Sequence, residues 1–222
     1  GTLQPIKLGF DRSRVNVVAS WMAGTRWSYR VSLRQDVRDG MRGIAGSSFS
    51  TAAQLAAPVD QVTDQLEASA SYVGRRVQAT LGYQVSLFRS GPESLTWSSP
   101  FSPVFTGSGV GQLALAPDNQ FHQIFGSAGY EVTPKIRASA DFAVGRMTQD
   151  ADFLAPTLNP NLPVTLADLP ARSLDGRVDT FNGNARITAT LSEQLRLHAS
   201  YSRDLRDNRT ASRAYPAVST DL

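Results

Sequence analysis

The sequence has 222 residues, of which 41% are hydrophobic, and its mean hydropathy of −0.22 suits a soluble β-protein and a membrane barrel equally well. Its 22 basic and 19 acidic residues are scattered along the chain, so the net charge of +3 indicates no basic patch and we expect no nucleic-acid partner. With no cysteine and only two histidines, the chain cannot attach haem c through C-x-x-C-H or hold an iron–sulfur cluster or structural zinc.

If the chain crosses a membrane, it does so with β-strands and not with helices. No run of about 18 apolar residues occurs, which excludes transmembrane helices. Strands of a membrane barrel remain compatible, because they need only about 9–11 residues, half of them polar. No signal peptide opens the sequence, so we expect a mature or internal segment.

Most of the chain alternates apolar and polar residues with a period of two, which is typical of β-strands with one apolar and one polar face. The regular segments are, in chain order, 15–21, 27–34, 65–72, 76–88, 135–144, 184–191 and 195–202. Between them, segment 121–130 alternates less cleanly, because Phe121 and Phe125 fall on the face opposite Ile124 and Tyr130. We therefore expect eight strands.

The connections alternate between short and long. Short turns are predicted near residues 24, 74, 134 and 193, and long loops at about 39–62, 89–120 and 149–178. Three long loops at one edge are unusual in a compact soluble domain but are the rule in outer-membrane barrels. Trp21, Trp27, Tyr72 and Tyr130 stand near the short turns, where a membrane interface favours aromatic side chains.

This layout predicts an all-β, antiparallel, up-and-down transmembrane β-barrel. The segment Tyr215–Leu222 resembles another long loop and lacks a terminal aromatic residue, so we expect residues 1–222 to form a single piece, about eight strands, of a larger barrel. The apolar faces would meet lipid. A soluble sandwich is the alternative, and it would bury Leu81, Phe142 and Leu197 in one dry interior.

The polar strand faces supply the candidate site residues, which we expect to line the lumen of the barrel. They are Arg30, Arg34, Glu67, Gln78, Gln84, Arg137, Asp141, Arg186, Arg196 and His198. We expect no catalytic, metal-binding or cofactor-binding residue. His198 and Ser200 share a strand face, but no carboxylate is placed behind the imidazole.

Two loop motifs carry little weight. Asp150 and Asp152 lack the glycine and distant glutamate of a calcium loop. The glycines between Gly107 and Gly111 do not join a strand to a helix, so a flexible loop is favoured over a phosphate site.

Several longer stretches resemble the MtrB/PioB family of decahaem-associated outer-membrane proteins. They are Leu55–Phe101, Leu113–Tyr130, Leu174–Ala189, Tyr201–Thr210 and Tyr29–Gly40, within which P-D-N-Q and S-L-T-W-x-x-P-F are the most specific elements. The resemblance implies a barrel of more than about twenty strands in the outer membrane of a Gram-negative bacterium, of which this chain is about a third. Some members carry a C-x-x-C, which this segment lacks.

The resemblance also implies the function. Members of the family sheathe a periplasmic multihaem c-type cytochrome in the lumen, so that electrons cross the outer membrane. Haem c would belong to the partner, and an extracellular cytochrome could meet the long loops. Three other functions stay open, namely a general or solute-specific porin, a hydrolase using His198 and Ser200, and a soluble adhesin or binding module.

Overall fold

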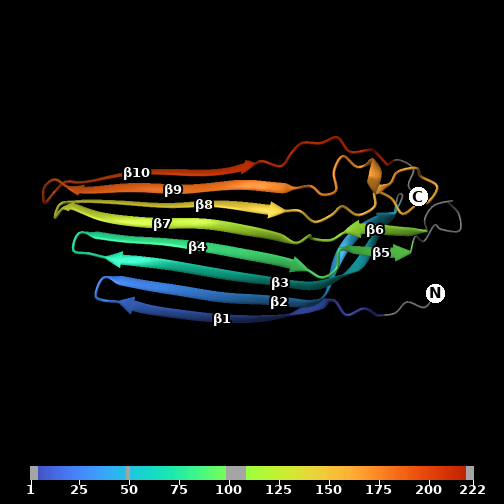
Figure 1. Cartoon of the computed structure of the whole chain (residues 1–222), viewed down its shortest axis with the longest axis horizontal. Helices are drawn as coiled ribbons and strands as arrows, with labels where there is room; N and C mark the ends of the chain where they lie inside the picture. The colour runs from blue at the N-terminus through green and yellow to red at the C-terminus, as the bar shows by residue number, and fades with distance from the viewer. Residues whose placement is uncertain (1–4, 49–50, 99–108, 219–222) are drawn as a thin grey trace.

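The computed structural model describes residues 5–48, 51–98 and 109–218, and an eight-stranded antiparallel sheet dominates them (Figure 1). Its order is β1-β2-β3-β4-β7-β8-β9-β10, and a separate two-stranded sheet pairs β5 with β6. The strands are β1 Gly9–Ala23, β2 Trp27–Ser48, β3 Thr51–Val73, β4 Val77–Ser90, β5 Ser94–Ser98, β6 Val110–Ala114, β7 Asn119–Thr133, β8 Ile136–Gln149, β9 Gly176–Thr190 and β10 Arg196–Asn208. Within the described part of the chain, no helix is long and apolar enough to cross a membrane.

The strands of the large sheet form four hairpins whose short turns gather at one end of the sheet, while the described part of the chain begins and ends at the other (Figure 1). Gly24 adopts a φ of +68° in the first turn, a conformation that glycine accepts without steric cost. The Gly74 amide donates to the Val77 carbonyl across 2.7 Å and closes the second turn. Every connection between hairpins therefore runs at the opposite end.

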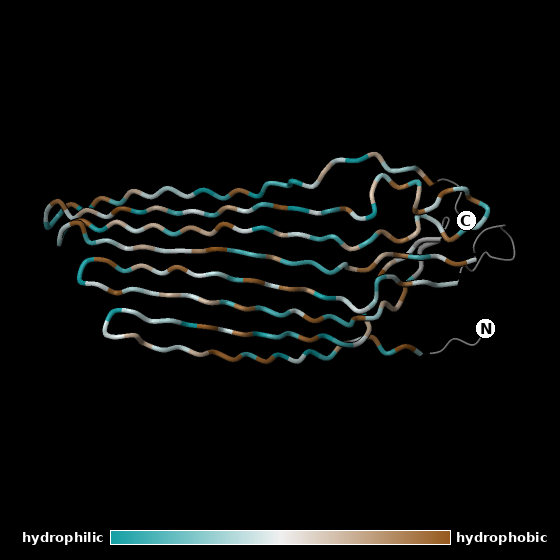
Figure 2. The backbone as a smooth tube through the Cα atoms, in the orientation of Figure 1, coloured by the Kyte–Doolittle hydropathy of each residue, from teal (hydrophilic) through white to brown (hydrophobic). Residues whose placement is uncertain are grey.

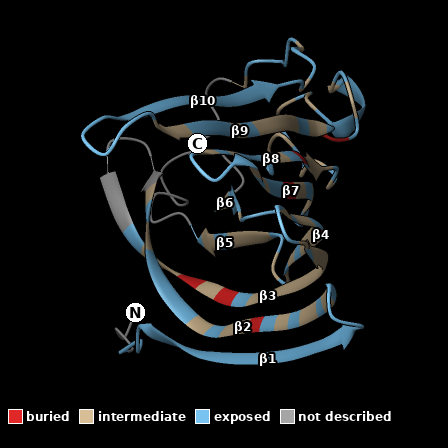
Figure 3. Cartoon of the chain, turned by 90° about the vertical axis from the view of Figure 1, so that its left-hand side faces the viewer, coloured by how far each residue is buried: buried red, intermediate tan, exposed pale blue. Residues whose placement is uncertain are grey.

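Viewed along the strands, the sheet is an open arc (Figure 3). In the described residues β1 pairs only with β2, and β10 pairs only with β9, so these two strands are its edges. Neighbouring strands pair residue for residue, so a line of register partners leads from Trp21 in β1 across every strand to Arg203 in β10. Among the described pairs of the large sheet, the register shifts at one place, between Glu131 and Thr133. The arc is thus part of the wall of an antiparallel barrel, which confirms the predicted fold class.

The prediction of a long loop at 39–62 is wrong. β2 and β3 continue past the region of clean alternation, with Asp39 opposite Asp60 and Ile44 opposite Leu55. Alternation fades there because side chains beyond a membrane no longer need one lipid-facing side, whereas backbone hydrogen bonding continues irrespective of side-chain type. The two strands form a long extension beyond the rest of the sheet.

The other two long connections contain more structure than predicted. Within 89–120, β5 and β6 form a hairpin in which Trp97 covers Gly111, its register partner. The S-L-T-W-x-x-P-F element ends, and the glycine motif begins, among residues 99–108, outside the described residues. Connection 149–178 holds a short 3₁₀ helix, Leu166–Asp168, and β9 already begins at Gly176.

The irregular alternation of β7 has a packing cause. Phe125 lies over its register partner Gly82 on β4, and Phe121 lies over Gly145 on β8, where a Cβ would stand 2.6 Å from the ring. Each ring fills the gap left by a glycine that has no side chain. Phe121 and Phe125 therefore lie on the otherwise polar face of β7 because each packs over a glycine of a neighbouring strand and stabilises it there.

We predict that Gly82→Val destabilises the full-length barrel by about 1–3 kcal/mol, because a side chain at this position would overlap the Phe125 ring. Gly129→Val is the matched control, since no atom lies within 4 Å of a Cβ built there. Thermal loss of β-structure, followed by circular dichroism and heat-modifiable gel mobility, measures both effects. Equal destabilisation by the two substitutions would contradict the packing role of Phe125.

Candidate functional site

The ten residues predicted to line the lumen all fall on one face of the sheet. Register fixes this, because Arg30 opposes Ser69, Glu67 opposes Gln84 and Arg137 opposes Thr188 in unbroken pairing. The face carries Arg30, Arg34, Glu67, Gln78, Gln84, Arg137, Asp141, Arg186, Arg196 and His198. They spread along the wall instead of converging on one point.

This polar face is the concave one. Gly46 of β2 shares it with Arg34, and a Cβ on Gly46 would lie 3.7 Å from the Trp97 ring. Trp97 belongs to β5, which lies within the arc of the large sheet in Figure 3. The β5–β6 hairpin therefore packs inside the curve, on the side to which the predicted lumen residues point.

The opposite, convex face is apolar and uncovered. Leu81 is 59% exposed, Phe142 42% and Leu197 51%, so these three side chains share no dry interior. In the described chain only Ala57 and Val59 are buried hydrophobic residues. Brown and teal alternate along the long strands in Figure 2, as two such faces require. An apolar face of this extent cannot remain in water, which excludes the soluble sandwich.

The apolar belt on the convex face runs diagonally across the strands. The register line that starts at Leu33 on β2 passes through Leu66 and Val85, and then meets His122 on β7. It continues through Arg146 and Asp179, so the residues on one register line are apolar on β2, β3 and β4 but polar on β7, β8 and β9. Strands tilted by about 35–45° within a membrane produce such an offset between register and depth.

Polar pairs border this belt at its loop end. On the convex face Arg89 forms an ion pair with Asp64, Tyr83 Oη lies 2.5 Å from His122 Nδ1, and Arg146 Nε lies 2.7 Å from an Asp179 oxygen. On β4 the apolar positions run from Val77 to Leu87, about the 9–11 residues that a tilted strand needs to cross a bilayer.

Aromatic rings mark the other border. The Trp21 and Tyr29 rings stack with centroids 5.3 Å apart, and those of Trp27 and Tyr72 lie 5.0 Å apart. All four belong to the ends of β1, β2 and β3 nearest the short turns. An apolar ring with a polar edge suits the interface between lipid headgroups and acyl chains.

An arginine cluster on the concave face was missed by the sequence analysis. Four guanidinium groups surround Asp36, whose side chain is only 10% exposed, at distances of 2.6, 2.8, 3.5 and 3.9 Å. They belong to Arg12, Arg14, Arg38 and Arg34, respectively. Charges that are scattered in the sequence thus do form a basic patch in the fold. The sequence did hold one sign of this cluster: Arg12 and Arg14 are two residues apart and continue the polar face that Asn16 begins on β1.

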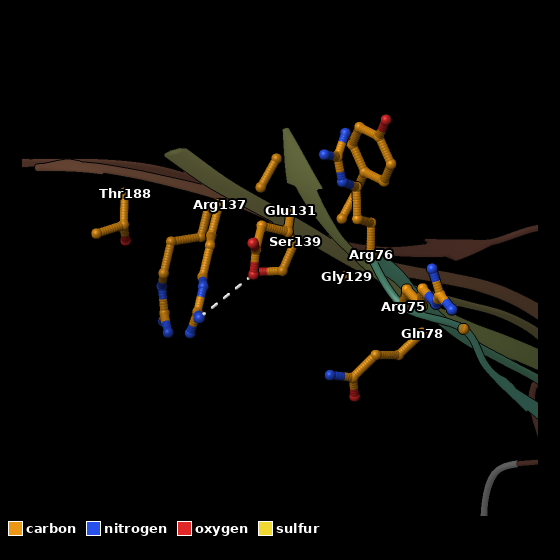
Figure 4. A pocket seen from close by; sticks show the side chains of 12 residues that line it. Arg75, Arg76, Gln78, Gly129, Glu131, Arg137, Ser139 and Thr188 are labelled. Carbon is orange, nitrogen blue, oxygen red and sulfur yellow. Dashed lines mark hydrogen bonds and ion pairs between the residues drawn. The ribbon is translucent and has the colours of Figure 1, made fainter. Parts of the chain in front are cut away.

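A second basic area lies on the concave face near the short turns, in a depression of about 320 Å³ (Figure 4). Arg75, Arg76 and Arg137 are among its lining residues. Arg137 points to Glu131, and the two groups form an ion pair of 3.4 Å.

Other motifs weighed from the sequence do not assemble into sites. His198 Nδ1 lies 3.2 Å from Thr188 Oγ1, and Asp204 accepts a bond from Asn182. Asp152 binds Arg172 at 2.6 Å, and this hydrogen bond lowers the pKa of the carboxyl group. Over the described ranges, no three His, Asp or Glu side chains cluster as metal ligands.

Comparison with known proteins shows the family to which this chain belongs. The family model of the outer-membrane beta-barrel porins MtrB/PioB matches residues 1–222. The chain belongs to the MtrB/PioB family. It is also similar to the outer membrane protein MtrB of Shewanella baltica strain OS185, with 28% identity over 218 residues, 98% of this chain. The chain spans 30% of the length of that relative.

Membership of the MtrB/PioB family agrees with both faces of the sheet. The chain is part of an outer-membrane β-barrel, as the resemblance implied. Its convex belt meets lipid, because a barrel wall exposes its apolar side to acyl chains and turns its polar side inward. We therefore infer that the concave face lines the lumen.

We predict that Leu81→Arg destabilises the assembled barrel by about 2–4 kcal/mol, since Leu81 lies near the middle of the convex belt on β4. Gln84→Arg, on the concave face of the same strand, is the matched control and is expected to be tolerated. The measurement is the amount of folded, heat-modifiable protein in outer-membrane fractions. A loss with Gln84→Arg but not with Leu81→Arg would reverse the assignment of the two faces.

Proposed function

We propose that the full-length protein sheathes a multihaem c-type cytochrome and supports electron transfer across the outer membrane. The observation that carries this proposal is the curvature of the polar wall. Eight strands close a barrel just wide enough for its own side chains, yet eight strands here leave the arc open. The complete barrel therefore encloses a lumen with room for a polypeptide.

The concave side chains suit such a guest. Gln78 and Gln84 offer amides, Arg30 and Arg186 offer guanidinium donors, and Ser and Thr lie between them. Such groups hydrogen-bond a polar protein surface directly or through water. The guest would be held in a fixed position while the convex belt insulates it from lipid.

We propose no catalytic role for the chain. Haem c, carried by the partner, would supply the electron carriers, and the chain's residues would bind and orient that partner. At the loop end, the β2–β3 extension and the β5–β6 hairpin would offer a platform for an extracellular cytochrome.

A porin is the second candidate, favoured by the family description and by the polarity of the concave face. The two functions differ in what fills the lumen. A porin holds water and conducts ions continuously, whereas a sheath filled by a protein conducts few ions until that protein is removed.

We expect affinity-tagged full-length protein, purified from solubilised outer membranes, to retain a haem-staining protein in fixed ratio. In planar bilayers the complex should show low conductance that rises once the partner is stripped away. The Leu81→Arg variant serves as the control, because a chain that does not assemble should retain no haem protein. Purification without haem, together with constant high conductance, would establish the porin instead.

A further inference from the structure

Positive charge is concentrated on one part of the concave face. On β1 and β2 this face carries Arg12, Arg14, Arg30, Arg34, Arg38 and Arg42, against the single acid Asp36. The neighbouring strands β3 and β4 carry one charged residue on the same face, Glu67. We call the six arginines of β1 and β2 the arginine patch.

Asp36 cannot neutralise the arginines around it. Its carboxylate carries one negative charge but is shared by four guanidinium groups, of which Arg12 and Arg14 lie closest at 2.6 and 2.8 Å. Arg38 and Arg34, at 3.5 and 3.9 Å, are held more weakly. All four side chains remain between 39% and 44% exposed. Several donors therefore stay free to bind an anion within the lumen.

Opposite the patch, Glu67 on β3, the register partner of Ser32, is the one acidic residue among the described concave positions of β3 and β4. The register partner of Asp36 on β3 is Thr63, and that of Arg34 is Gln65, both neutral. Arg30 and Arg42 have no ion-pair partner in the described ranges. Like charges this close repel one another, at a cost that salt reduces only in part when the groups are half-buried. An anionic counterpart would remove this cost.

The shape of the patch favours an extended counterpart over a small anion. From Arg30 to Arg42 it follows β2 for roughly 40 Å at about 3.3 Å per residue. The hollow beside Arg14 and Arg34 has a volume of about 340 Å³, is open to the lumen, and is also lined by Glu67. One phosphate would engage a small part of this surface, whereas a row of carboxylates could follow its length.

We propose that the arginine patch docks an acidic stretch of the polypeptide held in the lumen. The inference rests on the proposed sheathing function and adds the chemistry and orientation of the guest. An acidic side of the guest lies along β1 and β2, and a neutral polar side lies along β3 and β4. Electrostatic attraction of this kind steers and orients a partner in addition to holding it.

The test uses full-length protein in detergent and a fluorescent oligoglutamate peptide, with oligolysine and inorganic polyphosphate as comparison probes. The patch variant is Arg34→Gln with Arg38→Gln, which keeps the close contacts of Asp36 to Arg12 and Arg14. The control is Arg203→Gln with Arg206→Gln, which removes equal charge from β10, outside the arginine patch. Should the first variant fail to fold, Arg30→Gln with Arg42→Gln replaces it, since these arginines join no ion pair in the described chain.

We expect the patch variant to bind oligoglutamate roughly tenfold more weakly than wild type, and the control to bind as wild type does. Fluorescence anisotropy across a salt series measures this. The copurifying haem protein should also dissociate from the patch variant at a lower salt concentration than from wild type.

Equal weakening in both variants, no weakening, or binding of polyphosphate without oligoglutamate would overturn the inference. These outcomes are separate from the sheathing test. If wild-type protein retains no haem protein, the proposed function fails; if it retains one that the patch variant holds equally well, only the docking assignment fails.

Discussion

The structure depends on one constraint, which is that an apolar sheet face must leave water while every backbone amide and carbonyl remains hydrogen-bonded. Leu81, Phe142 and Leu197 remain 42–59% exposed on the convex face, so hydrocarbon is the medium that can accept them. Tilted antiparallel strands satisfy the backbone groups between neighbours and leave one face for lipid. The polar wall is the consequence of this arrangement, because alternate residues must point the other way.

The two borders of the convex belt differ in chemistry, and the lengths of the connections beside them orient the wall. Stacked aromatic rings such as Trp27 and Tyr72 occupy the turn end, whereas ion pairs such as Arg146 with Asp179 occupy the loop end. In outer-membrane barrels short turns face the periplasm and long loops face outward. The arginines near Arg137 therefore lie toward the periplasm, and the Asp36 cluster lies toward the cell exterior.

Strands, turns and faces were predictable where the membrane imposes period two, as in Tyr29–Leu33 and Leu81–Leu87. Prediction from the sequence was wrong beyond the membrane, where strands no longer need one apolar and one polar face. The continuation of β2 and β3 past Asp39 and Asp60 depends on backbone pairing, which leaves little trace in side-chain type. The Asp36 cluster combines two strands whose pairing had to be known before four distant arginines could be seen as one group.

The unpaired rims of the arc have a consequence for how such a protein is made. β1 and β10 each offer one row of backbone donors and acceptors that no other described strand meets. In acyl chains each unmet group costs several kcal/mol, and in water a bare rim is a template for any strand that passes. An isolated copy of this segment would therefore associate with other copies through β1 and β10. During biogenesis, the neighbouring hairpins of the barrel must pair with these edge strands before another copy does.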